Sequence, residues 1–343
     1  MPCLRIMSNR NMSAMDQKNE HRAVIIWLYF CCFMVFAMAV IGAVTRLAEA
    51  GLSMVEWRPL VGTIPPLSEA EWQRVFDLYR ETPEYRLKHY WMGIDDFKYI
   101  FFWEWLHRVW GRLIGLAFAL PLAWFWLRKK IPPGYGLSLT GLLILGGVQG
   151  VIGWWMVTSG LVDEPRVSPY RLAVHLGVAF IIFGWLFWLA RNLQNTAHPK
   201  ATDAAVRGAL MKIGLTALAL LAVTIIWGAF VAGYKAGLLY NTWPMMNESF
   251  TPQSPFTWYA IAYDHGWIQF FHRWVAIVAG GVICFFAFKT RDTLLGLMVV
   301  IQIGLGIATL LSQIWIPLAA LHQAGALLLL ALLLNRLHAL CRS

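Results

Sequence analysis

Eight apolar runs, each about as long as a lipid bilayer is thick, constrain the fold of this chain more than any other feature of its sequence. They lie at 23–44, 102–127, 137–159, 170–190, 208–232, 267–288, 293–311 and 315–335. A helix needs about 20 apolar residues to cross the hydrocarbon core, and its backbone groups must be paired within the segment. The sequence therefore predicts an all-α integral membrane protein with eight transmembrane helices.

Charge is scarce in this sequence and unevenly placed. Only 13% of the residues are charged, against about 25% in a typical soluble domain. The net charge of +10 does not indicate nucleic-acid binding, because the basic residues gather in alternate connections between apolar runs, such as Arg128-Lys129-Lys130. Cytoplasmic loops carry such an excess of Lys and Arg. We expect a multi-pass protein of the bacterial inner membrane, surrounded by lipid, with a cytoplasmic tail over 1–22 and both termini cytoplasmic.

The second half of the chain repeats the first. The repeated positions, first copy then second, are Gly42-Ala43 and Gly228-Ala229, Ala50-Gly51-Leu52 and Ala236-Gly237-Leu238, His107-Arg108 and His272-Arg273, Gln149 and Gln302, Gly153 and Gly306, and His175 and His322. Each copy has four apolar runs, an even number, so both copies have the same orientation in the membrane. The sequence predicts two parallel four-helix-bundle repeats.

The domain boundaries follow from this repeat. We expect an N-terminal unit over 23–192, a cytoplasmic linker over 193–207 and a C-terminal unit over 208–338. The N-terminal unit contains a long outer loop, 46–100. Within it, Ser68 followed three residues later by Glu71 predicts a short capped helix near 68–79.

Four of the nine histidines lie inside apolar runs, at repeat-related positions: His107, His175, His272 and His322. An ionisable side chain in a membrane is costly and is usually functional or paired. Each unit supplies one histidine from its second run and one from its fourth. Both runs enter from outside, so we expect two imidazoles per unit, near the outer surface and within about the first two turns of their helices. Small neighbours such as Gly111 and Gly115 permit either close helix packing or a flat ligand.

Two imidazoles per unit favour haem over zinc. Zinc takes a third and a fourth ligand, and the second unit has no inner acid near its histidines. Haem needs two axial ligands and an apolar slot. Arg108 and Arg273 follow two of the histidines and either pair with haem propionates or extend to the membrane interface. The residues therefore predict two haem sites, one in each unit.

The two units differ at one position that matters for chemistry. Glu104, three residues before His107, corresponds to Gln269 in the second unit. A carboxylate one helical turn from a haem ligand can accept protons or orient a reacting group. The alternative is a carboxylate paired with Arg108 or Arg112 at the water interface. The residues alone thus predict one haem site with an acid and one without.

Several motifs carry a resemblance to a known family. They are Thr45-Arg46-Leu47, the stretch from Gly51 to Pro59, Pro83-Glu84-Tyr85, the stretch from Glu104 to Arg112, and Asn241-Thr242-Trp243-Pro244-Met245. In these motifs, and from Ala23 to Leu337 as a whole, the sequence resembles the haem A synthase family (COX15/CtaA), in its proteobacterial and mitochondrial branch. The resemblance implies an oxidoreductase that oxidises the C8 methyl of haem O to a formyl group, by two hydroxylations and a dehydration. Its product, haem A, serves cytochrome oxidase assembly.

The same resemblance implies roles for individual residues. It makes His272 and His322 the ligands of a resident haem b, which is the cofactor. It assigns His107 and His175 to the substrate haem O, and makes Glu104 the acidic residue of that site. The electron acceptor, the origin of the formyl oxygen, docking of a haem O synthase and homo-oligomerisation stay open.

Two other classes of protein compete with this interpretation. A non-catalytic dihaem b-type electron-transfer cytochrome predicts two resident haems and unchanged haem chemistry. A transporter is disfavoured, because no apolar run has the Gly- and Pro-interrupted character of a midplane substrate site.

Overall fold

The computed structural model describes residues 21–56, 61–160, 165–194 and 203–342. These residues form no strand, and eight of their helices are long and apolar enough to cross a membrane. The eight are α2 (Arg22–Leu47), α4 (Ile94–Leu127), α5 (Gly136–Thr158), α6 (Pro169–Leu193), α7 (Ala204–Gly233), α9 (His265–Thr290), α10 (Thr293–Leu311) and α11 (Ile316–Arg342). The predicted all-α membrane fold with eight spans is confirmed.

Some sequence-based expectations fall outside the described residues. They concern most of the N-terminal tail, Trp57-Arg58-Pro59, and the part of the linker between 195 and 202. The shorter helical elements are η1 (Val61–Thr63), α3 (Glu69–Arg80), η2 (Tyr85–His89), η3 (Ala236–Leu238) and α8 (Ala260–Tyr263).

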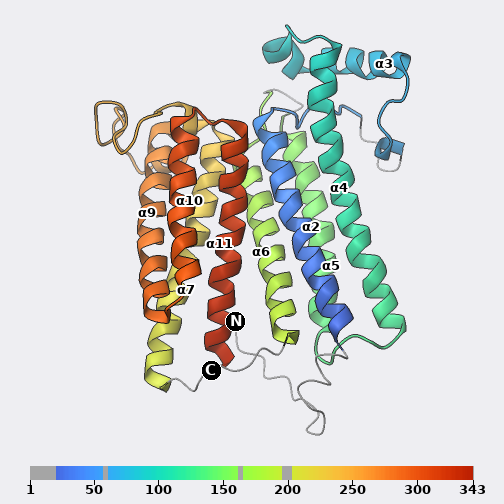
Figure 1. Ribbon diagram of the computed structural model, residues 1–343. Helices are drawn as coiled ribbons and strands as arrows, with labels where there is room; N and C mark the ends of the chain where they lie inside the picture. Colours follow the sequence, from blue (N-terminus) through green and yellow to red (C-terminus); the bar gives the residue numbers. More distant parts are fainter. Residues whose placement is uncertain (1–20, 57–60, 161–164, 195–202, 343) are drawn as a thin grey trace.

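The helices form two neighbouring groups (Figure 1). One group holds α2, α4, α5 and α6, and the other holds α7, α9, α10 and α11. The groups meet where α6 packs on α7 and where α11 packs on α2 and α6. Gln323 of α11 donates from Nε2 to the carbonyl of Ala39 of α2 at 2.7 Å across this boundary. The arrangement is compatible with two four-helix repeats.

The connections between spans show the same correspondence. A non-glycine residue with left-handed backbone follows α2 and α7, namely Glu49 and Lys235, each with φ of 53°. Another pair follows α4 and α9, where Lys129 and Arg291 have φ of 53° and 54°. A residue with left-handed backbone just after a helix turns the chain away from the helix axis. The backbone N–H groups that follow can then donate to the last carbonyls of the helix. Equivalent spans in the two groups therefore end in the same way.

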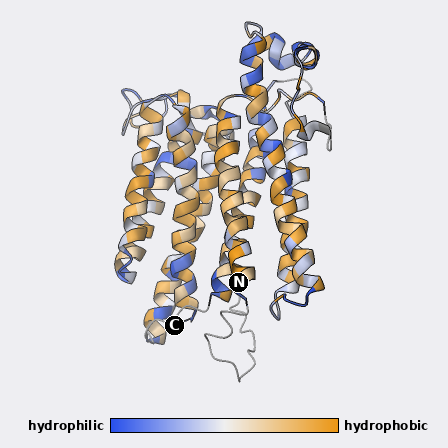
Figure 2. Cartoon of the chain, turned by 45° about the vertical axis from the view of Figure 1, so that its right-hand side comes forward, coloured by the Kyte–Doolittle hydropathy of each residue, from blue (hydrophilic) through white to orange (hydrophobic). Residues whose placement is uncertain are grey.

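Apolar side chains both fill the interior and cover the outside of the spans. Leu28, Leu139, Phe286 and Leu333 are completely buried in one core cluster that extends through both groups. Other large apolar side chains on the spans, such as Leu127, are exposed. Figure 2 shows hydrophobic residues along the length of the spans and hydrophilic residues mainly in the connections and near α3. A lipid solvent explains this distribution, because apolar surface needs no burial there.

A cap segment, residues 48–56 and 61–93, lies at one end of the bundle around α3 (Figure 1). The predicted short helix is confirmed as Glu69–Arg80, and the backbone N–H of Glu71 donates to Oγ of Ser68 at 3.2 Å. The start of α2 and the end of α11 lie at the opposite end of the bundle.

Helix α4 begins earlier than the apolar run from 102 indicates. Its first residue is Ile94, because the N–H of Gly93 donates to Oδ2 of Asp96 at 3.1 Å and caps the helix there. The added turns carry Phe97 and neighbouring apolar residues onto Tyr79 of α3. Burial against α3 thus continues the helix beyond the membrane span.

This extension corrects one expectation about the histidines. His107 follows the first residue of α4 by 13 positions, so it does not lie within the first two turns of its helix. His175, His272 and His322 follow the first residues of α6, α9 and α11 by six, seven and six positions. For these three the expectation is right, since two turns span about seven residues.

Candidate functional site

The four histidines form two pairs, one in each group of helices. His107 of α4 and His175 of α6 interact electrostatically. His272 of α9 and His322 of α11 do the same. All four side chains are partly buried. The structure therefore brings together the two histidines of each group, from its second and its fourth span.

These pairs fit a ligand that takes two imidazoles. Nδ1 of His175 and Nδ1 of His272 are buried without a hydrogen-bond partner among the described residues. Across the described ranges, no three or more His, Cys, Asp and Glu side chains gather closely enough to hold a metal ion. A haem iron takes its two axial ligands from the protein, and each pair supplies that number. His272 and His322 would hold such a haem in the second group, and His107 and His175 in the first.

A glutamine contacts one histidine of each pair. Nε2 of Gln149 donates to the carbonyl of His175, and Nε2 of Gln302 donates to the carbonyl of His322, both at 2.9 Å. Nε2 of Gln302 also lies 3.2 Å from Nδ1 of His322. The repeat in the sequence therefore corresponds to a repeated contact.

Each histidine ring also faces a glycine on the span before its own. We call these four the histidine-facing glycines. A Cβ atom built on each would lie 3.3 Å from the ring of His107 at Gly42, 3.1 Å from that of His175 at Gly153, 3.0 Å from that of His272 at Gly228 and 2.9 Å from that of His322 at Gly306. The glycines beside the histidines on the same helix behave differently, since Gly111 faces Met38 and Gly115 faces open space.

Glu104 is buried, with 3% of its surface exposed. The hydroxyl of Ser53 and the backbone N–H of Met54 both donate to its Oε2 at 2.7 Å. Arg108, one turn further along α4, donates to Oε1 at 2.6 Å. The pairing with Arg108 that the sequence left open is therefore present. The carboxylate also holds the start of the cap segment onto α4.

The corresponding position in the second group makes fewer contacts. Nε2 of Gln269 donates to the carbonyl of Tyr240 at 3.1 Å, and its Oε1 is buried without a partner among the described residues. Arg273 donates to the carbonyls of Tyr240, Thr242 and Met245 at 2.7, 2.9 and 3.2 Å. Arg108 likewise donates to the carbonyl of Met54 at 3.1 Å. Both arginines therefore hold a connecting segment onto the helix that carries one histidine of the pair.

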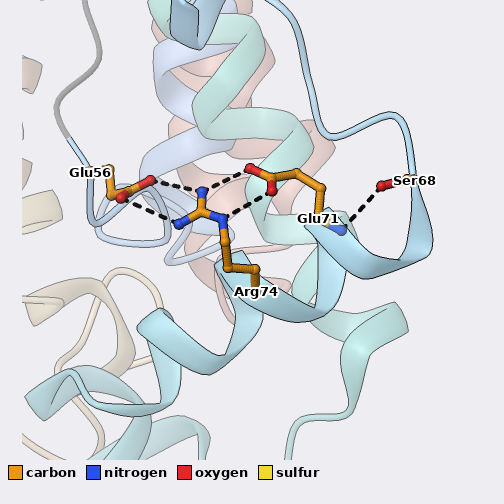
Figure 3. Close-up of polar contacts among 4 residues, drawn as sticks. All are labelled: Glu56, Ser68, Glu71 and Arg74. Atoms are coloured by element: carbon orange, nitrogen blue, oxygen red, sulfur yellow. Dashed lines mark hydrogen bonds and ion pairs between the residues drawn. The ribbon is translucent and has the colours of Figure 1, made fainter.

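The segment that contacts Glu104 is held from its other side by α3 (Figure 3). The guanidinium of Arg74 lies between two carboxylates, 2.8 Å from Glu71 and 2.9 Å from Glu56. Ser68 accepts from the N–H of Glu71 at the first turn of the same helix. Residues 53–56 are therefore fixed between α4 and α3, with their donors aimed at Glu104.

A second polar cluster lies in the cap segment. The hydroxyl of the fully buried Tyr79 donates to Oε2 of Glu84 at 3.1 Å and lies 2.6 Å from Nδ1 of His89. Burial raises the pKa of Glu84 to about 7, and the negative charge of Glu104 also raises it. Burial lowers the pKa of His89. Glu84 and Glu104 are thus electrostatically coupled although they belong to different contacts.

Two contacts join the cap end of the two groups. Arg46 of α2 donates to the carbonyls of Ala232 and Gly233, the last residues of α7, at 3.1 Å each. Glu49 pairs with Lys235, which occupies the corresponding position in the other group. A cation at a helix C-terminus meets the negative end of its dipole. These contacts join the ends of α2 and α7, one span from each group.

The sequence did not indicate several residues of this site. Ser53 and Met54 hold Glu104 from 51 and 50 positions away, and no local pattern predicts such a contact. The histidine-facing glycines did carry a signal, because they recur at repeat-related positions. That signal marks equivalent positions and does not say which side chain they face.

Comparison with known proteins identifies the family of this chain. Residues 25–334 match the COX15-CtaA family, described as cytochrome oxidase assembly proteins. The chain is 50% identical over 334 residues to a haem A synthase of Rhodospirillum centenum, covering 93% of this chain and 88% of that protein. It is 44% identical to a haem A synthase of Nitrosospira multiformis, over 92% of this chain and 94% of the relative. A haem A synthase of Agrobacterium fabrum is 42% identical, over 92% and 89%.

The range that matches the family overlaps all eight spans and contains the positions of the four histidines. The family resemblance that the sequence motifs carry is therefore confirmed. The chain belongs to the COX15-CtaA family of cytochrome oxidase assembly proteins.

Proposed function

We propose that this protein is a haem A synthase, an oxidoreductase that converts the C8 methyl of haem O into the formyl group of haem A. The observation that carries the proposal is the asymmetry of the two histidine pairs. Each pair offers two imidazoles, and only the first has a buried carboxylate, Glu104, one turn from a histidine. The relatives that match nearly the whole chain are named haem A synthases.

The two pairs have different roles in this proposal. His107 and His175 hold the substrate haem O, beside the acid. His272 and His322 hold a resident haem b, beside the neutral Gln269. A haem bound there supplies a one-electron relay, because its iron can be reduced and reoxidised. The acid suits the first site for oxidation of the substrate, which involves proton transfer. The neutral amide suits the second site for electron transfer.

Glu104 is the residue that accepts and donates protons at the substrate site. An ionised carboxylate offers about four lone-pair positions, and Ser53, Met54 and Arg108 occupy three of them. The remaining position can accept a proton or a hydrogen bond from the reacting group. The three donors fix the orientation of the carboxylate, and a fixed proton acceptor accelerates proton transfer by about 10²–10⁴-fold.

Arg108 and Arg273 are candidates for contact with the haem propionates. Both follow a histidine of a pair directly in the sequence, and both donate to carbonyls of connecting segments. A guanidinium has five N–H donors, so these contacts do not exhaust its capacity. In this role the arginines hold the connecting segment and the carboxylates of the ligand together.

We place the protein in the bacterial inner membrane, with both termini in the cytoplasm and the cap segment outside. The start of α2 and the end of α11 share one end of the bundle. Basic residues follow the spans there, including Arg128-Lys129-Lys130 after α4 and Arg291 after α9. Positive loops favour the cytoplasmic side. The chain then consists of two units, 23–192 and 208–338, each with one histidine pair, and a cytoplasmic linker joins them.

Pigment analysis tests this function. The full chain is expressed in a strain that makes haem O but lacks its own haem A synthase, and the extracted haems are separated. Formyl-bearing haem is the expected result. Unchanged haem together with two bound haems per chain would instead identify a dihaem electron-transfer cytochrome.

The Glu104→Gln variant tests the role of the acid, since glutamine keeps the size of the side chain. We expect at least about 100-fold less haem A, with the haem of the second pair still bound. Glu81→Gln, at an exposed position after α3, is the matched control. Full haem A formation by Glu104→Gln would contradict the role of the carboxylate while leaving the enzyme assignment intact.

A further inference from the structure

The histidine-facing glycines differ from the other tightly packed glycines of the spans in what they contact. At Gly153, Gly228 and Gly306, all three of the nearest atoms to an added Cβ belong to one imidazole ring. At Gly42, both atoms within 4 Å belong to the ring of His107.

Glycines that serve helix packing show a different environment. A Cβ at Gly280 would lie 2.8 Å from Ile303 and 3.2 Å from Val299. One at Gly214 would lie 2.5 Å from Leu337. In these cases the missing Cβ makes room for large apolar side chains, including Phe286 at Gly214, as at any close contact between membrane helices. At the histidine-facing glycines the nearest atoms to the added Cβ belong to the imidazole.

We propose that Gly42, Gly153, Gly228 and Gly306 are positioning residues that set where each imidazole ring stands relative to its ligand. The inference rests on the proposed function, in which these histidines hold haem. The contact recurs four times, each time from the span that precedes the histidine's own span. Because the ring lies against the backbone of the preceding span, it cannot move closer to that helix.

The physical reason is the narrow tolerance of a metal–imidazole bond. Mutation of a group that orients a ligating histidine typically lowers metal affinity by about 10–100-fold. At Gly306 the added Cβ would lie under 3.0 Å from the ring, so something must shift, and at the other three, 3.0–3.3 Å away, the neighbour must give by a few tenths of an ångström. At these positions the shifting group would be the imidazole, and a functional site tolerates displacements of only about 0.5 Å.

The four contacts are not equally tight, and the difference follows the two groups of helices. The added Cβ would lie 3.0 and 2.9 Å from the rings of the second pair, at Gly228 and Gly306. It would lie 3.3 and 3.1 Å from those of the first pair, at Gly42 and Gly153. An added methyl group would therefore crowd the ring most at Gly306 and least at Gly42.

Alanine substitutions with matched controls test the proposal. Gly228→Ala and Gly306→Ala are compared with Gly281→Ala on α9 and Gly304→Ala on α10, where an added Cβ meets nothing within 4 Å. All four changes replace a helical glycine by a better helix former. The readouts are the haem retained per polypeptide and the low-spin ferric haem spectrum of the purified full chain, with helix content measured in parallel.

We expect about tenfold weaker haem retention, or a shifted low-spin spectrum, in Gly228→Ala and Gly306→Ala, and a smaller effect in Gly42→Ala. The controls should match the unaltered protein. If Gly228→Ala and Gly306→Ala keep the unaltered spectrum and haem content, the positioning role is overturned. If His272→Ala itself keeps its haem and spectrum, the proposed haem site fails instead, so the two failures are distinguishable.

A rescue experiment separates positioning from a general packing defect. His272→Gly removes the imidazole, and free imidazole added in solution can then take its place at the iron. We expect free imidazole to restore the low-spin spectrum equally in His272→Gly and in the double variant with Gly228→Ala, because a detached ring can shift away from the added methyl group. Rescue of the single variant alone would show that the alanine disturbs helix packing, and would overturn the positioning role.

Discussion

The hydroxyl of Ser53 donates a 2.7 Å hydrogen bond to the carboxylate of Glu104, 51 positions later in the chain. This contact ties the cap segment to α4, which carries Glu104 one turn before His107. The adjacent N–H of Met54 donates to the same oxygen, so the turn at 53–54 acts as a unit. The orientation of the carboxylate depends on a segment that lies outside the spans.

Ser53→Ala should therefore lower haem A formation without removing the second haem. A hydrogen bond to a charged group contributes about 1.5–3 kcal/mol, and Met54 and Arg108 retain part of the hold on Glu104. We expect about tenfold slower conversion of haem O, since each 1.4 kcal/mol is a factor of about ten in rate. The conversion is measured in membranes, with the haem b spectrum as the reference for folding.

Ser254→Ala is the control for this variant. Ser254 lies in the segment before α9, and its backbone carbonyl, which alanine keeps, accepts from Trp267. Conversion at the unaltered rate in Ser53→Ala would show that the remaining donors hold Glu104 unaided.

Gln269→Glu should destabilise the second group, although it makes the two groups more alike. The amide of Gln269 donates to the carbonyl of Tyr240, and a carboxylate at that place would bring two acceptors together. Leaving buried acceptors unpaired costs about 1–3 kcal/mol. We expect a lower unfolding temperature in detergent, followed by the haem absorbance. An unfolding temperature equal to that of the unaltered protein would mean that Arg273 turns to pair with the new carboxylate.

Stability should fall as the pH rises through about 7, because of Glu84. Burial raises the pKa of Glu84 from 4.5 to about 7, so the folded protein binds this proton more tightly than the unfolded chain does. The stabilisation is complete below pH 4.5 and is lost as the pH rises through 7. The side chain in Glu84→Gln stays neutral at every pH. The unfolding temperature of this variant should therefore decline less between pH 5 and 8 than that of the unaltered protein, and the difference is the contribution of this one carboxyl group.

Thermal unfolding in detergent over this pH range measures the difference. Glu81→Gln serves as the control, because Glu81 is exposed and lies only three residues away. Parallel curves for the unaltered protein and Glu84→Gln would contradict the role of this carboxyl group.

The two contacts between the groups should differ in strength. Arg46→Met removes two hydrogen bonds from a cation to carbonyls at the end of α7, and we expect a loss of about 2 kcal/mol. Lys235→Met removes a pair whose side chains are 42% and 27% exposed, which contributes about 0–1 kcal/mol. Unfolding in detergent ranks the two variants. A larger loss for Lys235→Met would mean that the ion pair is the stronger link between the groups.

The spans and the histidines could be predicted because each depends on local sequence. A run of about 20 apolar residues suffices for a span, and His175 or His322 stands out as an ionisable residue within such a run. The start of α4 could not be placed by hydropathy, because the turns from Ile94 lie among Asp95, Asp96 and Lys98. Their burial depends on α3, which hydropathy does not connect to α4.

The contacts around the site needed the three-dimensional structure. The partners of Arg46 are backbone carbonyls, which have no signature in the sequence. The glycine at Gly306 could be recognised as the repeat of Gly153, but the ring it faces depends on how α10 and α11 are rotated against each other. Glu104 could be singled out as an acid that lacks a counterpart, whereas its donors come from a turn about 50 positions away.

Helix α4 is continuous from Ile94, where it packs on α3, through Glu104 to Leu127. Between Ile94 and Glu104 the helix has no break, so a displacement of α3 would be transmitted along α4 to the carboxylate. Binding of another molecule to the cap segment would therefore change the position of the acid beside the first histidine pair.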